Sequence, residues 1–194
     1  MKKLMMIAAM MVAVMSSNAQ EAGTMFIKPM AGGQFTTVTG SDSDNTKMKA
    51  GVVGGAEFGY KVKNNLGLTA GLLYSNQGCR VKDDEGDFNS NANYLNVPVL
   101  VNYYVIPNLA LKIGGQVGFM MSAKSDDDDI KDMCNKVDFS IPFGVAFEAK
   151  DGWVVEARYN LGLTNVMKKD IVGKNNHNSV IMVTFGYKIP LNKK

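Results

Sequence analysis

Apolar and polar residues alternate strictly along several long segments of this chain. Between residues 153 and 164, every odd-numbered residue is apolar or aromatic, and Glu156, Arg158 and Asn160 stand between them. A period of two is the period of a β-strand, whose successive side chains point to opposite faces. The same alternation runs through residues 93–105, 137–149 and 178–191. The chain is therefore expected to form sheets in which each strand has one apolar face.

The alternation predicts eight strands, joined by connections of two kinds. The strands are expected near residues 24–35, 50–62, 66–79, 93–105, 109–122, 137–149, 153–164 and 178–191. The connections after the second, fourth and sixth strands are short and turn-like, as at Lys150-Asp151-Gly152. The other four connections, near residues 36–49, 80–92, 123–136 and 165–177, are longer and polar. One end of the sheet thus carries turns and the other carries loops.

An even number of strands, with turns at one end and loops at the other, is typical of an outer-membrane barrel. In hydrocarbon every backbone N–H and C=O must be paired within the protein, and a closed sheet satisfies this because it has no edge. The sequence therefore predicts an all-β fold, an eight-stranded antiparallel up-and-down transmembrane β-barrel. Its outward aromatic residues would lie near the membrane interfaces; they are Tyr103, Phe147, Trp153, Tyr159, Phe185 and Tyr187.

The first nineteen residues have the pattern of a secretory signal peptide. Lys2 and Lys3 precede twelve apolar residues, 4–15, and Ser17-Asn18-Ala19 provides the small residues of a cleavage site. Twelve residues are too few to cross a bilayer as a helix. We therefore expect residues 1–19 to be the signal peptide and residues 20–194 to form the barrel domain.

Eleven glycines fall inside the predicted strands, where glycine normally weakens a sheet. In a tightly curved sheet they relieve crowding instead, and we expect this role for Gly32, Gly33, Gly51, Gly54, Gly55, Gly59, Gly67, Gly71, Gly114, Gly115 and Gly118.

The chain resembles the small outer-membrane β-barrel proteins of the PorT-like and opacity-like type found in Bacteroidetes. The likeness rests on the leader end Asn18-Ala19-Gln20, on residues 94–100 (YLNVPVL) and on the last strand, residues 184–191 (TFGYKIPL). That strand resembles the signal read by the barrel-assembly machinery, although Pro190 interrupts it and no terminal aromatic residue follows. The resemblance implies an outer-membrane location, contact with the lipid bilayer, and the assembly machinery as a partner during biogenesis.

Nine charged residues fall on the face opposite to the apolar one. They are Lys28, Glu57, Lys61, Lys112, Asp138, Glu148, Glu156, Arg158 and Lys188. The interior of an eight-stranded barrel is only wide enough for side chains. We therefore expect these lumen charges to pair and to fill the barrel.

Catalytic and cofactor sites are not indicated. The single histidine, His177, lies in an Asn-rich segment without a recognisable motif, so neither a nucleophilic triad nor a metal site is expected around it. The acidic run Asp126, Asp127, Asp128 and Asp129 is a weak Ca²⁺ candidate without the spacing of a calcium loop. The net charge of +3 also argues against nucleic-acid binding.

Two cysteines, Cys79 and Cys134, both fall at the predicted loop end. Export permits a disulfide between them, but the strands concerned are not neighbours in the predicted order, so two free thiols remain the alternative.

We expect a non-enzymatic barrel with a structural or surface-interaction role, whose long loops face outward toward an unknown ligand. Two alternatives stay open at this stage. One is a soluble lipid carrier with the apolar face turned inward, as in lipocalins, and the other is a narrow pore or transport component.

Overall fold

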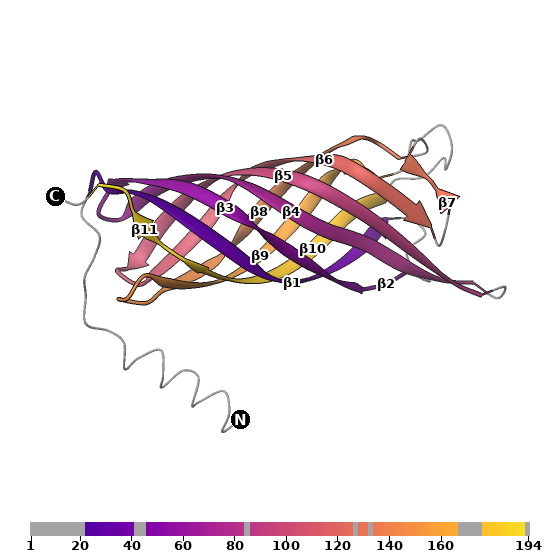
Figure 1. Cartoon of the computed structure of the whole chain (residues 1–194), viewed down its shortest axis with the longest axis horizontal. Helices are drawn as coiled ribbons and strands as arrows, with labels where there is room; N and C mark the ends of the chain where they lie inside the picture. Colours follow the sequence, from indigo (N-terminus) through magenta and orange to yellow (C-terminus); the bar gives the residue numbers. More distant parts are fainter. Residues whose placement is uncertain are drawn as a thin grey trace, which may run out of the picture.

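The computed structural model describes residues 22–40, 46–83, 86–125, 128–131, 134–166 and 176–192. The predicted signal peptide therefore lies outside the described residues. Eight long strands make up the fold (Figure 1). They are β1 (Met25–Gly40), β3 (Lys49–Lys63), β4 (Leu66–Asp83), β5 (Gly86–Ile106), β6 (Leu109–Ser125), β8 (Val137–Glu148), β9 (Trp153–Asn165) and β10 (Asn176–Tyr187).

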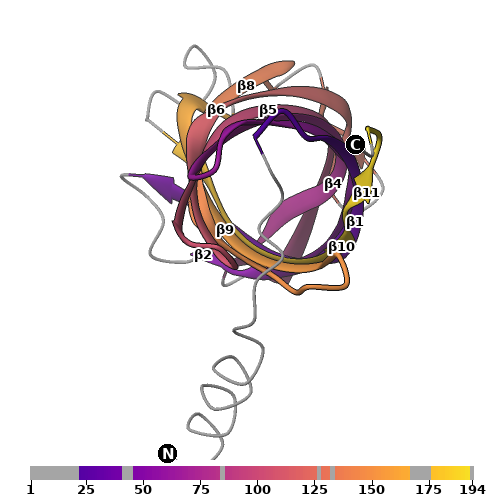
Figure 2. The ribbon, with the colours of Figure 1, turned by 90° about the vertical axis from the view of Figure 1, so that its left-hand side faces the viewer.

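The eight strands close into a barrel. Each long strand pairs antiparallel with the next one along the chain, and β10 pairs with β1 from Met30 opposite Gly186 to Gly40 opposite Asn176. Figure 2, viewed along the barrel axis, shows the ring that results. The predicted fold class is confirmed.

Three two-residue strands extend the sheet at its two ends. β2 (Thr46–Lys47) pairs with β4, and β7 (Asp128–Asp129) pairs with β6. β11 (Ile189–Pro190) pairs with Phe26 and Ile27 of β1. The predicted last strand, 178–191, is therefore divided at Lys188 into β10 and β11.

The strands at the loop end are longer than the sequence pattern predicts. The expected loop at residues 80–92 is largely a hairpin, in which β4 and β5 stay paired as far as Asp83 opposite Gly86. β1 likewise continues to Gly40, and His177, expected in a loop, lies in β10. The pattern fails here because most residues of these extensions are polar, so apolar alternation stops although the backbone pairing continues.

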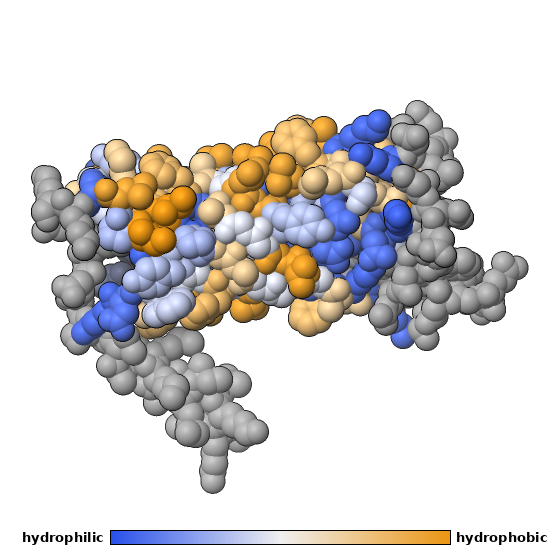
Figure 3. Space-filling view, viewed as in Figure 1, coloured by the Kyte–Doolittle hydropathy of each residue, from blue (hydrophilic) through white to orange (hydrophobic). Residues whose placement is uncertain are grey.

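Apolar side chains face outward along the middle of the barrel. On β9 the burial alternates residue by residue, with Val155 exposed and Glu156 buried. Figure 3 shows apolar residues across the middle of the barrel and polar residues gathered toward the end that carries β7. This arrangement is opposite to that of a soluble lipid carrier, whose apolar residues would line the cavity.

No helix among the described residues is long and apolar enough to cross a membrane.

Some of the strand glycines are required by close backbone approach and others are not. A Cβ atom added at Gly114 would lie 2.0 Å from the carbonyl oxygen of Val99 on the paired strand. The neighbouring Gly115 has nothing within 4 Å of such an atom. The predicted relief of crowding therefore applies to Gly114 but not to Gly115.

Candidate functional site: the barrel lumen

The structure directs all nine predicted lumen charges into the barrel. Seven of them are buried, and Asp138 and Glu148 are half-buried because they lie near the two ends of β8. The strands bring these residues together in three groups along the lumen: a central cluster, a turn-end group and an isolated carboxylate at the loop end.

The central charge cluster consists of Lys28, Glu57, Lys112, Glu156 and Arg158. Lys28 Nζ lies 2.8 Å from Oε2 of both Glu57 and Glu156. Lys112 Nζ lies 3.0 Å from Glu57 Oε2 and 2.8 Å from Glu156 Oε2. Each carboxylate is therefore shared between two lysines.

Arg158 completes the central charge cluster from β9. Its Nη2 lies 2.6 Å from Glu57 Oε1 and also pairs with Glu156 Oε1, which receives a further bond from Arg158 Nε at 2.7 Å. Three cations and two carboxylates leave the cluster with one net positive charge. Buried charges are tolerated only when they are paired and hydrogen-bonded in this way.

The turn-end group joins Lys188 to Glu148. Lys188 Nζ lies 2.6 Å from Glu148 Oε1, and the Tyr104 hydroxyl donates to the same oxygen at 3.1 Å. Lys61 points toward this pair from β3, with its Nζ 4.3 Å from the centroid of the Tyr104 ring. Lys188 Nζ also lies over the Phe26 ring at 4.2 Å, so cation–π contacts support both lysines.

Asp138 lies apart from the other lumen charges, near the loop end of β8. It accepts hydrogen bonds from the Thr164 hydroxyl and, at 3.3 Å, from Asn178 Nδ2. Among the residues that the structure describes, no lysine or arginine forms an ion pair with it. Its expected pairing with another lumen charge is therefore not seen there.

Uncharged side chains fill the lumen on the loop side of the central charge cluster. Met30, Val53, Leu73, Val180 and Met182 form an apolar cluster in which no member is more than 6% exposed. Nearer the loop end, Gln34 Nε2 donates to the Ser75 hydroxyl at 2.8 Å, which links β1 to β4 across the intervening strand. Sequence reasoning missed these residues, because an apolar residue on the inward face breaks the alternation and a neutral amide carries no charge signal.

Several buried amides in the lumen lack a protein partner within the described part of the chain. Both side-chain polar atoms of Asn160 are unpartnered, and so are Asn96 Nδ2, Gln116 Oε1 and Arg158 Nη1. Buried polar atoms of this kind are commonly satisfied by internal water. The arrangement can thus hold isolated water molecules among tightly packed side chains.

The structure adds no support for a catalytic or metal site at the remaining sequence candidates, His177 and the acidic run at residues 126–129. His177 Nδ1 lies 3.1 Å from the backbone oxygen of Thr164. No group of three or more metal-ligating side chains occurs among the described residues, but the side chains of the acidic run at residues 126–129 lie outside them. The possible calcium site there stays a prediction.

Cys134 is buried at the loop end of the lumen, in an apolar cluster with Ala92, Tyr94, Met120 and Ala123. The side chain of Cys79 lies outside those that the structure describes. The disulfide between Cys79 and Cys134 therefore also stays a prediction.

Comparison with known proteins agrees with the closed fold. The family described as "Outer membrane protein beta-barrel domain" matches residues 18–168, which is most of the chain. The chain belongs to this outer-membrane β-barrel family. As a member, it resides in the outer membrane, and the apolar outer face contacts the lipid bilayer.

Solved structures of outer-membrane barrels have the same fold. The attachment invasion locus protein Ail of Yersinia pestis is 14% identical, with a TM-score of 0.52 over 87% of this chain and 99% of that one. Neisserial surface protein A is 12% identical, with a TM-score of 0.54 over 85% of this chain and 97% of that one. At these identities the likeness concerns the fold alone. No curated protein sequence matches the chain.

Proposed function

We propose that this outer-membrane barrel is a closed, non-enzymatic scaffold that presents its loop end for structural or surface interactions. The observation that carries the proposal is the filled lumen. The central charge cluster joins β1, β3, β6 and β9 across the interior through contacts of 2.6 to 3.0 Å. A channel through this cluster would have to separate buried ion pairs, which costs several kcal/mol for each ion left unpaired.

The apolar cluster on the loop side supports a closed barrel as well. Leu73 is completely buried, and Met182 is 1% exposed, although both face the lumen. A water-filled pore would leave such side chains exposed. These residues favour the scaffold over the narrow pore or transport component that the sequence left open.

The loop end is the part of the barrel best suited to meet a partner. β4 and β5, with 18 and 21 residues, are the longest strands and form a paired hairpin at that end (Figure 1). Long loops of outer-membrane barrels face outward and short turns face the periplasm. We infer that the unknown ligand binds at this end, where loops on a rigid scaffold usually carry function.

The names of the structural relatives agree with a surface role. Ail is named for attachment and invasion, and Neisserial surface protein A is named for its location. The proposal has three further parts: the narrower PorT-like and opacity-like type, assembly by the barrel-assembly machinery, and the signal peptide at residues 1–19. The barrel type and the assembly route rest on the sequence resemblance, and the signal peptide rests on the residue pattern at positions 1–19.

Conductance in planar bilayers tests the closed lumen. The purified full-length barrel should add no discrete single-channel steps to the bilayer, whereas a general porin inserted under the same conditions should add them. Reproducible steps from the unmodified barrel would replace the scaffold with a pore.

Epitope labelling in intact cells tests the exposed end. A short tag inserted between residues 83 and 86 should bind antibody from outside the cell. The same tag in the turn at residues 64–65 should bind antibody only after the outer membrane is opened. The reverse pattern would place the hairpin in the periplasm and remove the proposed surface role.

A further inference from the structure

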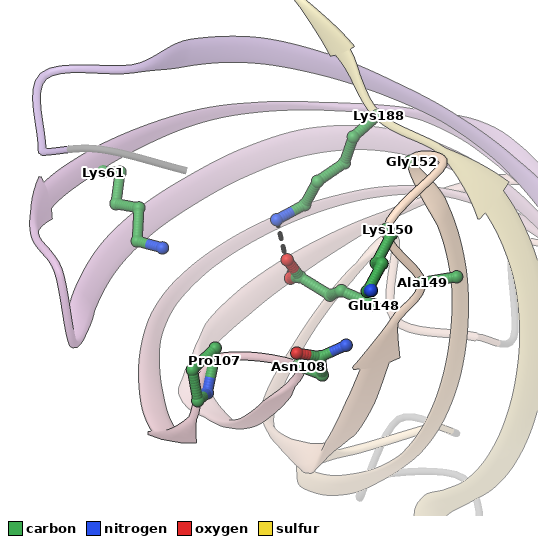
Figure 4. Close-up of a pocket in the computed structure, with 8 residues that line it drawn as sticks. All are labelled: Lys61, Pro107, Asn108, Glu148, Ala149, Lys150, Gly152 and Lys188. Carbon is green, nitrogen blue, oxygen red and sulfur yellow. Dashed lines mark ion pairs between the residues drawn. The ribbon is translucent and has the colours of Figure 1, made fainter. Parts of the chain in front are cut away.

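A small pocket opens into the lumen at the turn end of the barrel (Figure 4). Its wall is formed by Lys61 near the end of β3, Glu148 at the end of β8, Lys188 after β10, and the turns that follow β5 and β8. The cavity volume is about 50 Å³. Because about 15 Å³ is enough for one water molecule, the pocket has room for roughly three waters or one small oxyanion.

The pocket is electropositive. Lys61, Lys150 and Lys188 line it, and Glu148 is the single acidic residue among its lining side chains. The Glu148 carboxylate is engaged by Lys188 at 2.6 Å and by the Tyr104 hydroxyl at 3.1 Å. Lys61 and Lys188 against this one carboxylate leave an excess of one positive charge among the described lumen groups around the cavity.

Lys61 supplies an ammonium group that the described protein does not satisfy. The residue is only 2% exposed, and its ammonium group borders the cavity. Its Nζ lies over the Tyr104 ring, but it forms no hydrogen bond or ion pair with any residue in the described part of the chain. Figure 4 shows the side chain directed into the pocket. A buried ammonium normally requires an anionic or hydrogen-bonding partner.

We propose that this pocket binds a phosphate group, with the Lys61 ammonium as its principal ligand. Lysine is a common phosphate ligand, acting as a compact point charge with three donors. Lys188 adds positive charge on the opposite wall. The turns face the periplasm in barrels of this family, so the phosphate belongs either to a soluble phosphate compound of the periplasm or to the headgroup of an inner-leaflet phospholipid.

This site is independent of the proposed surface role, because it lies at the opposite end of the barrel. Phosphate binding at the turn end can therefore be absent while the loop end still has its surface role. The surface role can likewise be absent while phosphate still binds.

Phosphate titration of the refolded full-length barrel tests the proposal. The barrel is held in an uncharged sugar detergent, and inorganic phosphate is added during calorimetry. Saturable binding is expected, and Lys61→Met should weaken it by about tenfold or more, the loss expected for one charge-assisted hydrogen bond. Lys63→Met is the matched control, since Lys63 lies two residues away on the same strand with its side chain exposed; it should bind as tightly as the unmodified barrel. No saturable binding, or equal binding by Lys61→Met, would overturn the proposal.

A measurement on the unmodified barrel covers the case in which Lys61→Met does not fold. In solution NMR, the side-chain signals of Lys61 should shift saturably with phosphate, while those of Lys63 should stay in place. Micelles doped with short-chain phosphatidylglycerol distinguish the two sources. A saturable Lys61 shift that phosphatidylglycerol causes and that added free phosphate reverses supports a lipid headgroup. A shift with free phosphate but none with phosphatidylglycerol supports a soluble ligand. No Lys61 shift with either compound would contradict the site.

Discussion

Adjacent glycines in β6 have different structural requirements. A Cβ atom at Gly114 would lie 2.0 Å from the Val99 carbonyl oxygen and 2.9 Å from the Leu100 Cα, both backbone atoms of the paired strand. Gly115 faces outward into open space. The sequence shows two identical residues side by side, so only the curvature of the folded sheet can tell which one tolerates a side chain.

Alanine substitutions should separate these two glycines. Gly114→Ala requires the paired backbone to move and should destabilise the barrel by roughly 1 to 3 kcal/mol. Gly115→Ala should change stability by less than about 0.5 kcal/mol. Urea unfolding from lipid vesicles, followed by tryptophan fluorescence at Trp153, measures both. A similar loss at both positions would show that backbone approach is not the cause.

The central charge cluster depends on Glu57 to satisfy three cations. Lys28, Lys112 and Arg158 all contact its carboxylate. Glu57→Gln leaves those buried cations under-compensated and should destabilise the barrel by roughly 3 to 5 kcal/mol. Asp151→Asn, at an exposed turn position, should have almost no effect.

A second substitution tests whether charge balance is responsible. Lys112→Met removes one of the under-compensated cations, so the double variant Glu57→Gln, Lys112→Met should recover part of the stability lost in Glu57→Gln alone. Unfolding midpoints in urea provide the comparison. Strictly additive losses would mean that shape, rather than charge, sets the cost.

At the scale of single strands, the predictable part of the fold is the part that lipid constrains. Along β9 the outward residues must be apolar and the inward ones are mostly polar, so the alternation shows the strand and its two faces. Beyond the apolar band this constraint ends. The outer part of the β4–β5 hairpin consists mostly of polar residues, and for that reason the sequence predicted a loop at residues 80–92.

An outward charge should be costly only within the apolar band. Val183 is exposed in the middle of the outward row of β10, between Ile181 and Phe185. Val183→Arg should lower stability by roughly 2 to 4 kcal/mol, while Thr39→Arg, exposed near the loop end of β1, should cost at most about 1 kcal/mol. The yield of folded barrel in isolated outer membranes and urea titration check this. Equal losses of stability at Val183 and Thr39 would contradict the placement of Val183 within the lipid-facing apolar part of the barrel and of Thr39 near its loop end.

The outer part of the β4–β5 hairpin should be dispensable for folding. Replacing residues 80–89 by a two-residue turn removes the pairs beyond Cys79 and Ser90 and the two pairs between β2 and β4. None of these pairs belongs to the closed ring of eight strands. The shortened barrel should insert and unfold like the full-length one to within about 1 kcal/mol. Failure to assemble would show that the hairpin guides folding, and loss of surface binding alone would agree with the proposed function.

For the whole molecule, closure depends on a seam between the first and last long strands. β1 and β10 pair along eleven consecutive positions. A ring of this kind resists detergent until it is heated, so unboiled samples should migrate differently from boiled ones on a gel. A run with and without reductant, compared with a Cys134→Ser variant, also tests the predicted disulfide. Identical mobility before and after boiling would contradict a closed barrel.

The lumen charges show how far sequence reasoning reaches at this scale. Their inward direction follows from the alternation within each strand, but their grouping follows from the register between strands. Lys28 and Glu156 are 128 residues apart, yet Lys28 Nζ lies 2.8 Å from the Glu156 carboxylate. Asp138, on the same face, stays outside both paired groups because it lies at the far end of β8.

The position of the central charge cluster relative to the seam also bears on how the barrel inserts. Lys28 belongs to β1, whereas Glu156 and Arg158 belong to β9, on the other side of the junction with β10. Before β1 and β10 meet, the sheet is open, and these ions have no partners across the gap. Lys28 can still pair with Glu57 on β3, and Arg158 with Glu156 on its own strand, but the contacts that cross the lumen are missing. An open sheet with these partly paired ions is costly in hydrocarbon. The cluster therefore favours closure: incomplete barrels are disfavoured in the membrane, and pairing the two end strands brings Lys28 within 2.8 Å of the Glu156 carboxylate.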